Sequence, residues 1–148
     1  DGSGVSVDAI VSDFIAGAVE QMIPEAATDH WDIVEGQGAL VHPAFAGVTL
    51  GLLHGAQPNA FVVCHEAGRE NLSGFDHHKT GSIAEIIAPT VSLCRRFSPD
   101  IRCVGLCINT SRLDDAAAKS TLDALSNEHG VPACDPVRYG VSRIVDRL

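Results

Sequence analysis

A carboxylate followed by a glycine-rich turn is the first pattern in the chain that could do chemistry. Glu35 comes directly after the apolar residues Ile33 and Val34, and the glycines that follow it let the backbone approach a ligand closely. We interpret Trp31 to Glu35 as a buried strand, and in open α/β sheets ligands bind at the C-terminal edge of the strands. Glu35 could there act as a general base, orient a substrate amine or hold Mg²⁺ through water, whereas the structural alternative is an acceptor for turn amides. The turn adds the candidate binding residues Gly36, Gln37 and Gly38.

Three polar side chains follow a second apolar run. Ala60 to Cys64 is apolar at every position, as expected of a parallel strand that is covered on both faces. His65 and Glu66 come next, and Arg69 carries the planar guanidinium that suits a carboxylate or a phosphate. We predict His65 as a second catalytic residue, with Glu66 and Arg69 as ligand-binding residues. The alternative is a solvated, charged loop.

Two more strands are expected to end in polar residues. Ile101 to Ile108 is a long strand-like run that leads into Asn109 and Thr110, and the short extended segment Pro132 to Asp135 precedes Arg138. Polar residues at four successive strand edges are better evidence for a binding cleft than any single one of them. The side chains expected to converge on this cleft are Glu35, His65, Arg69 and Asn109.

The first residues combine a glycine-rich turn with two acids. A turn that leads into a helix can bind phosphate or carboxylate through free backbone amides, although an ordinary tight loop has the same composition. Asp8 is expected to complement the helix dipole, and Asp13 is expected to point inward because core positions flank it. Neither Lys79 nor Lys119 follows the glycine pattern of a full phosphate loop. The candidate binding residues in this region are Gly2, Ser3, Gly4, Asp8 and Asp13.

The five cysteines are interpreted as small buried hydrophobic residues in a reducing compartment. Cys103 and Cys107 should share one face of a strand, but their spacing differs from that of a zinc knuckle, so no metal site is predicted. The sequence contains no nucleophile elbow and no cysteine with an obvious histidine base. Covalent catalysis is therefore not indicated.

The charge and the hydropathy of the chain limit the kinds of molecule that the protein is expected to bind. The chain of 148 residues has 19 acidic and 10 basic side chains, and its net charge of −9 opposes binding to nucleic acid. Its apolar runs are shorter than the roughly 18 residues that a membrane helix needs, so no membrane partner is expected. No secretory leader is visible, and we expect a cytoplasmic protein that acts on a small molecule.

Helical and strand-like patterns alternate along the chain. This order implies right-handed βαβ units and an α/β fold, with a mostly parallel sheet of about four strands and helices on both faces. Residues 65–79 are expected to form a long polar loop. The opening glycine turn normally follows a strand in such folds, so residues 1–148 are expected to be the C-terminal part of a longer α/β domain. The expected helices are Val7 to Ile23, Pro43 to Leu53, Ser82 to Phe97, Asp114 to His129 and Arg138 to Leu148.

Several short motifs are distinctive when they are taken together: Gly2 to Phe14, Val34 to Gly38, His42-Pro43, Gly51 to Gly55, Cys64 to Glu66, Asn109-Thr110 and Asp135 to Arg138. They resemble a bacterial and archaeal P-loop family long described as a domain of unknown function. The resemblance covers essentially the whole chain and implies a P-loop NTPase-like, Rossmann-like three-layer fold. The phosphate loop of that family lies upstream of the residues present here.

Members of that family have been assigned as D-glutamate N-acetyltransferases. The resemblance therefore implies transfer of an acetyl group from acetyl-CoA to the amino group of D-glutamate. The segment from Val34 also resembles dethiobiotin synthetases, so an ATP- and Mg²⁺-dependent ligase or kinase is the alternative, and a non-catalytic nucleotide-binding module is a third. The cofactor thus stays open between acetyl-CoA and ATP with Mg²⁺. We also expect an exposed docking surface and a homo-oligomer.

Overall fold

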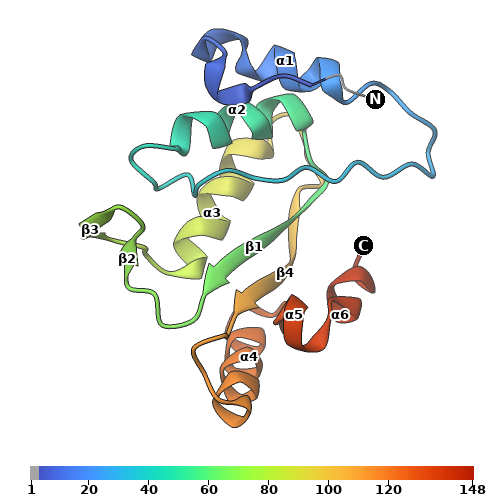
Figure 1. The fold of residues 1–148 in the computed structure, drawn as a ribbon. Coiled ribbons are helices and arrows are strands. Elements are labelled where there is room, and N and C mark those ends of the chain that lie inside the picture. Colours follow the sequence, from blue (N-terminus) through green and yellow to red (C-terminus); the bar gives the residue numbers. More distant parts are fainter. Residues whose placement is uncertain (1–3) are drawn as a thin grey trace.

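A parallel sheet forms the centre of the molecule (Figure 1). The computed structural model describes residues 4–148, in which the strands β1 (Ala60–Glu66), β4 (Arg102–Asn109) and β5 (Ala133–Cys134) lie in the order β1-β4-β5. Both strand pairs are parallel. The predicted α/β class and the adjacency of the second and third expected strands are confirmed. Helices connect the strands, as the βαβ pattern requires.

Two helices cover one face of this sheet. α3 (Ile83–Cys94) begins with a capping box, in which the Ser82 side chain accepts a hydrogen bond from the Glu85 N–H and the Glu85 carboxylate accepts one from the Ser82 N–H. α4 (Asp115–His129) begins at the Asp114 cap and ends at Gly130. Both helices pack into the main core cluster, whose buried members are Val63, Ile83, Leu106, Ile108, Leu122 and Ala133.

Two short helices lie at the C-terminus, where the sequence predicts one. α5 (Pro136–Tyr139) and α6 (Ser142–Val145) are separated at Gly140, whose φ of 75° interrupts the helix. Ile144 of α6 packs with Val104 and Cys134 in a second cluster. Because this cluster involves the opposite face of β4 from the main core, the sheet has helices on both faces.

The first predicted helix is broken into three pieces. Two 3-10 turns, η1 (Val7–Ala9) and η2 (Ser12–Phe14), precede the α-helix α1 (Ile15–Met22). α1 packs against α2 (Ala46–Ala56), and their buried residues form a separate cluster. Gly51 and Gly55 of α2 allow the close approach of the two helices, since a Cβ at either position would collide with α1.

We expect Gly55→Ala to destabilise the full-length protein by about 1–3 kcal/mol, as overpacked helix contacts do. The new Cβ would lie against the Ala16 carbonyl oxygen and 2.6 Å from the Val19 Cβ. Gly47 is the matched control, because it lies on the same helix and a Cβ added there would meet no atom within 4 Å. Gly47→Ala should be neutral or stabilise by up to about 1 kcal/mol. Urea unfolding checks both variants, and equal midpoints would contradict the expectation.

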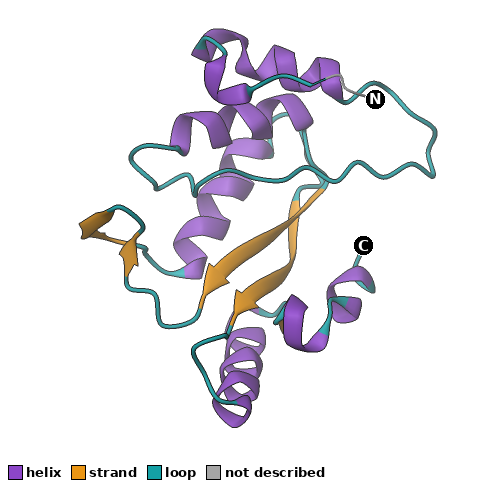
Figure 2. Ribbon diagram, in the orientation of Figure 1, coloured by secondary structure: helices purple, strands orange, loops and turns teal. Residues whose placement is uncertain are grey.

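The expected strand from Trp31 to Glu35 is wrong. Figure 2 shows this part of the chain within a long loop between α1 and α2, and Ile33 is 96% exposed. A strand needs the backbone groups of a neighbour, and among the described residues β1 pairs with β4 alone. The sheet of residues 4–148 therefore has three strands, and not about four.

The predicted loop 65–79 contains a small hairpin. Its strands are β2 (Asn71–Leu72) and β3 (Phe75–Lys79), and they pair antiparallel. Phe75 packs edge-on against the buried His42, with 5.2 Å between the ring centroids. This contact attaches the hairpin to the loop that precedes α2.

A bulge in β4 separates two cysteines that were expected to share a face. Phe61 pairs with Cys103 and Val62 pairs with Gly105, so Val104 is an extra residue in β4. Cys103 therefore packs against the main core, whereas Cys107 packs with Val104 on the opposite face.

No helix in the described part of the chain has the length and apolar character required to cross a bilayer.

Candidate functional site

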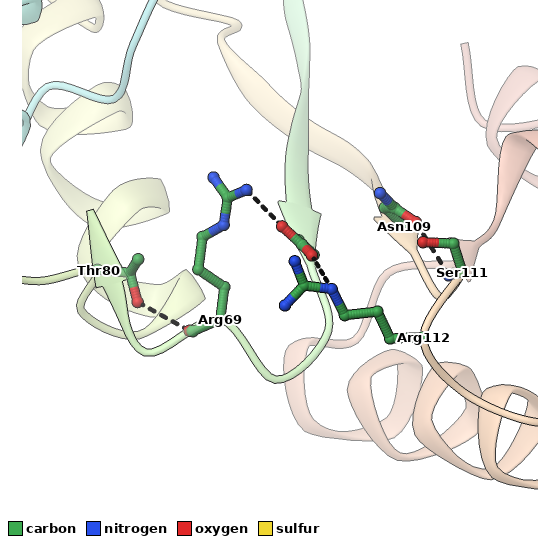
Figure 3. Close-up of polar contacts among 6 residues, drawn as sticks. Arg69, Thr80, Asn109, Ser111 and Arg112 are labelled. Atoms are coloured by element: carbon green, nitrogen blue, oxygen red, sulfur yellow. Dashed lines mark hydrogen bonds and ion pairs between the residues drawn. The ribbon is translucent and has the colours of Figure 1, made fainter. Parts of the chain in front are cut away.

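At the end of β1, the carboxylate of Glu66 forms ion pairs with the side chains of two arginines (Figure 3). Its Oε1 lies 3.0 Å from Nε of Arg112, and its other oxygen forms an ion pair with the guanidinium of Arg69. In register, Glu66 is the partner of Asn109 at the end of β4. Because the strands are parallel, their carboxyl ends bring Arg69 and Arg112 to one edge of the sheet, although 43 residues separate them in sequence.

This cluster carries a net positive charge. One carboxylate neutralises one of the two guanidiniums, and the Glu66 side chain is only 12% exposed while Arg69 and Arg112 are 44% and 77% exposed. The guanidiniums therefore present remaining N–H donors to solvent. Donors of this type bind the oxygens of carboxylates and phosphates.

Asp135 ties the end of β4 to the start of α5. Its Oδ2 accepts hydrogen bonds from the Thr110 hydroxyl at 2.6 Å and the Thr110 N–H at 3.0 Å. Its Oδ1 accepts from the N–H groups of Val137 and Arg138. Burial opposes ionisation of this carboxyl, but the four hydrogen bonds outweigh it and lower the pKa of Asp135 below its usual range.

A cavity of about 490 Å³ opens beside this junction. It lies at the carboxyl ends of β1 and β4, where ligands bind in open α/β sheets. Thiol, imidazole, amide and guanidinium groups all reach its wall. The lining residues are Cys64, His65, Cys107, Asn109, Ser111, Asp135, Pro136, Val137 and Arg138.

The surroundings of His65 favour the neutral form of its imidazole. Its partial burial lowers the pKa of the imidazole most, and the positive charge of Arg69 lowers it further, while Glu66 acts in the opposite direction. A neutral imidazole in a cavity wall can accept a proton. The arrangement thus combines a base, a cationic cluster and a cavity at one sheet edge.

The matching family model is described as a domain of unknown function, DUF1611_C, P-loop domain, and it covers residues 1–145. The chain belongs to the DUF1611 family. Two relatives, from Pseudoalteromonas sp and Tritonibacter scottomollicae, are named D-glutamate N-acetyltransferase. They are 46% and 40% identical over 147 residues, which is 99% of this chain and 44% of each relative.

A solved structure of a DUF1611 family protein from Anabaena variabilis has the same fold. The TM-score is 0.87 at 35% sequence identity, over 99% of this chain and 43% of that one. The family resemblance stated from the motifs is therefore confirmed. The chain spans less than half the length of these relatives.

The structure brings part of the predicted DUF1611 site together. His65, Asn109 and Arg138 line the cavity, and Glu66 and Arg69 lie in the ion cluster at the same end of β1. Thr110 is fully buried and holds Asp135, so its observed contact is structural. The predicted convergence thus includes His65 and Asn109 at the cavity itself.

The residues around Glu35 lie elsewhere, in the exposed loop. Glu35, Gly36 and Gln37 are exposed and are not part of the cavity wall. The carbonyl oxygen of Gly38 accepts a hydrogen bond from the Thr49 hydroxyl, and Phe45 packs against this glycine. The expected delivery of Glu35 by a strand edge is wrong, because that strand is not formed. Its catalytic role stays a prediction.

The amino-terminal candidates also lie away from the cavity. Gly2 and Ser3 fall outside the described residues. Gly4 and Asp8 are exposed, and Asp13 is exposed as well, contrary to its expected inward position. Asp13 belongs to the 3-10 turn η2, whose geometry differs from the single helix on which that expectation depended.

Arg112, Asp135 and Cys64 are among the residues of the site that were not predicted as ligands. Arg112 and Asp135 join it through contacts with Glu66 and Thr110, which are distant from them in sequence, whereas Cys64 directly precedes the predicted His65. The Asp-Pro pair that begins α5 is the one local signal, since aspartate caps helices and proline favours their first turn. Among residues 4–148, no three His, Cys, Asp or Glu side chains are grouped so that they could hold a metal ion.

Proposed function

We propose that this chain is the C-terminal part of an enzyme that transfers an acetyl group from acetyl-CoA to the amino group of D-glutamate. Two relatives at 46% and 40% identity carry that name, and the chain covers 44% of their length. The family match and the α/β fold support a common architecture. The activity of the whole protein is thus inferred for this chain from similarity and from its site.

The observation that carries the proposal is the pair of arginines around Glu66. D-Glutamate has two carboxylates, and the exposed donors of Arg69 and Arg112 suit such a dicarboxylate. The net positive charge of the cluster also attracts a substrate whose own net charge is negative. Arg69 would bind one carboxylate of the substrate, with Arg112 beside it.

His65 is the base that the geometry favours. An amine attacks an acyl carbon only in its neutral form, so the ammonium group of D-glutamate must lose a proton. His65 lies in the cavity wall, and its lowered pKa leaves it unprotonated at neutral pH. Glu35 remains the alternative base predicted from the sequence.

The cavity also offers groups for a phosphate-bearing cofactor. Arg138 supplies a cation and Asn109 an amide, and both lie in its wall. These donors fit an anionic ligand such as acetyl-CoA, and they would fit ATP as well. The turn at Gly2, Ser3 and Gly4 remains a predicted phosphate contact.

Titration of the full-length protein with acetyl-CoA and with Mg·ATP tests the proposal. Release of free CoA that depends on D-glutamate, together with N-acetylglutamate in the product mixture, supports it. Hydrolysis of ATP that depends on substrate, without CoA release, would instead favour the ligase or kinase. Binding of either nucleotide without turnover would favour a non-catalytic module.

We expect Arg69→Ala to raise the KM for D-glutamate by roughly 10–100-fold, because a charge-assisted hydrogen bond is worth about 1.5–3 kcal/mol. The kcat should change much less, since this contact positions substrate without taking part in proton transfer. Arg95→Ala is the matched control, because Arg95 is exposed beyond the end of α3. Steady-state kinetics on full-length enzyme checks both. An unchanged KM in Arg69→Ala would remove Arg69 from the substrate site.

A further inference from the structure

Three cysteines lie in one row across the sheet. In the strand register, Cys64 of β1 is the partner of Cys107 of β4, and Cys107 is the partner of Cys134 of β5. Register partners in neighbouring strands project from the same face. The row is thus a property of the tertiary structure, since 43 and 27 residues separate its members in sequence.

The row runs from solvent into the protein. Cys64 is exposed, Cys107 is half-buried and Cys134 is buried with Val104 and Ile144. Cys64 and Cys107 both line the 490 Å³ cavity that also contains His65 and Asn109. Packing accounts for Cys134, but it does not account for an exposed thiol in the wall of a cavity that also presents an imidazole and an amide.

We propose that Cys64 is a catalytic nucleophile, which takes the acetyl group from acetyl-CoA as a thioester and passes it to the substrate amine, while Cys107 positions the Cys64 sulfur by a hydrogen bond. This inference rests on the proposed acetyl transfer and adds a covalent step to it. The sequence does not indicate covalent catalysis, because the pairing of the two thiols depends on the sheet.

The environment of Cys64 favours its thiolate. The hydrogen bond with Cys107 lowers the pKa of Cys64 to about 6, and partial burial opposes this only in part. The same hydrogen bond, followed by burial, raises the pKa of Cys107, which therefore stays protonated and donates. The exposed member of the pair carries the charge because water solvates it there. A thiolate is the nucleophilic form of cysteine.

The two half-reactions balance without an oxidant or reductant. In the first, the Cys64 sulfur bonds to the acetyl carbon, the bond from that carbon to the CoA sulfur breaks, and CoA leaves as a thiolate. In the second, the neutral amine of D-glutamate forms the C–N bond, the bond to the Cys64 sulfur breaks, and His65 accepts the proton from nitrogen. The Cys64 thiolate is regenerated, and its low pKa makes it a good leaving group.

Rapid mixing of full-length enzyme with acetyl-CoA alone tests the covalent step. Intact-protein and peptide mass spectrometry should find one acetyl group, located on Cys64, which disappears when D-glutamate is added. Cys64→Ala and Cys64→Ser should lose this label and at least about 100-fold in kcat, as loss of a nucleophile predicts. Cys103→Ala is the matched control, because Cys103 is half-buried on the other face of β4, and it should keep both the label and the rate.

The role of Cys107 has its own measurement. The pH at which Cys64 is half-alkylated by iodoacetamide should be near 6 in the wild type and move toward the ordinary thiol value of 9.0 in Cys107→Ala. A purely structural role for Cys107 would leave that midpoint unchanged. A wild-type midpoint near 9.0 would overturn the inference.

The outcomes separate this inference from the proposed function. If wild-type enzyme acetylates D-glutamate and Cys64→Ala does so within a few-fold of the same rate, direct transfer is correct and the covalent step is wrong. If wild-type enzyme releases no CoA with D-glutamate present, the proposed function is wrong, and the inference that rests on it falls with it.

Discussion

His65→Gln is expected to lower the kcat of the full-length enzyme by about 10²–10⁴-fold, the usual contribution of a general base. Glutamine keeps a similar size and can still form hydrogen bonds, but it cannot accept a proton near neutral pH. His65 lies in the cavity wall, and its partial burial and the charge of Arg69 lower the pKa of its imidazole. The KM for D-glutamate should change little if, as proposed, Arg69 and Arg112 bind its carboxylates.

The pH dependence of the wild type gives a second measurement. A base must be unprotonated, so kcat/KM should fall as the pH drops through the pKa of His65 in the free enzyme. Because that pKa is lowered, the midpoint of the fall should lie below the usual histidine value of 6.5.

Glu35→Gln is the comparison that decides between the two predicted bases. If His65 is the base, Glu35→Gln should keep turnover within a few-fold of the wild type, as expected of an exposed loop residue. A loss of about 10²–10⁴-fold in Glu35→Gln, with near-normal rates in His65→Gln, would assign the base to Glu35.

Asp135→Asn is expected to destabilise the protein by about 2–4 kcal/mol at neutral pH. The Asp135 carboxylate is 3% exposed and accepts four hydrogen bonds, two on each oxygen. Asparagine would replace one oxygen with an NH₂ group that faces donors. Thermal or urea unfolding measures the loss. Asp100→Asn is the control, because Asp100 is exposed in a turn and its substitution should cost less than about 0.5 kcal/mol.

The contribution of the Asp135 carboxylate to the free energy of unfolding depends on pH. The folded protein holds the pKa of this carboxyl below the usual value of 3.8, so the stabilisation is present above pH 3.8 and is lost as the pH falls through the lower, folded value. The difference in stability between wild type and Asp135→Asn should therefore shrink only below about pH 3.8. A difference that stays constant down to strongly acidic pH would contradict this assignment.

Local sequence patterns were sufficient to predict the helices and strands that depend on residues close to one another in the chain. The apolar run that begins at Ala60 and the one that ends at Ile108 form β1 and β4. The Ser82–Glu85 capping box places the start of α3 within one residue, and the Asp114 and Gly130 caps do the same for both ends of α4. These signals are contacts between residues close in sequence, so they can be identified without the fold.

The same reasoning failed where an element depends on a distant partner. Trp31 to Glu35 has the composition of a buried strand, but a strand forms only when another backbone satisfies its N–H and C=O groups, and no pairing for this segment exists within residues 4–148. The bulge at Val104 is likewise a property of the pairing between β1 and β4, and it reversed the face assigned to Cys103.

The sequence by itself determined the α/β class and the family. It also determined that His65, Glu66 and Arg69 lie at the end of β1. Only the tertiary structure decided which groups join them. Parallel pairing allows Arg112 to form an ion pair with Glu66 and Thr110 to donate a hydrogen bond to Asp135, and it makes Cys107 the register partner of Cys64. The two residues of each pair are at least 25 positions apart in sequence. Parallel strands are joined by long crossover connections, so the residues that they bring together are far apart in sequence and cannot be paired from a local pattern.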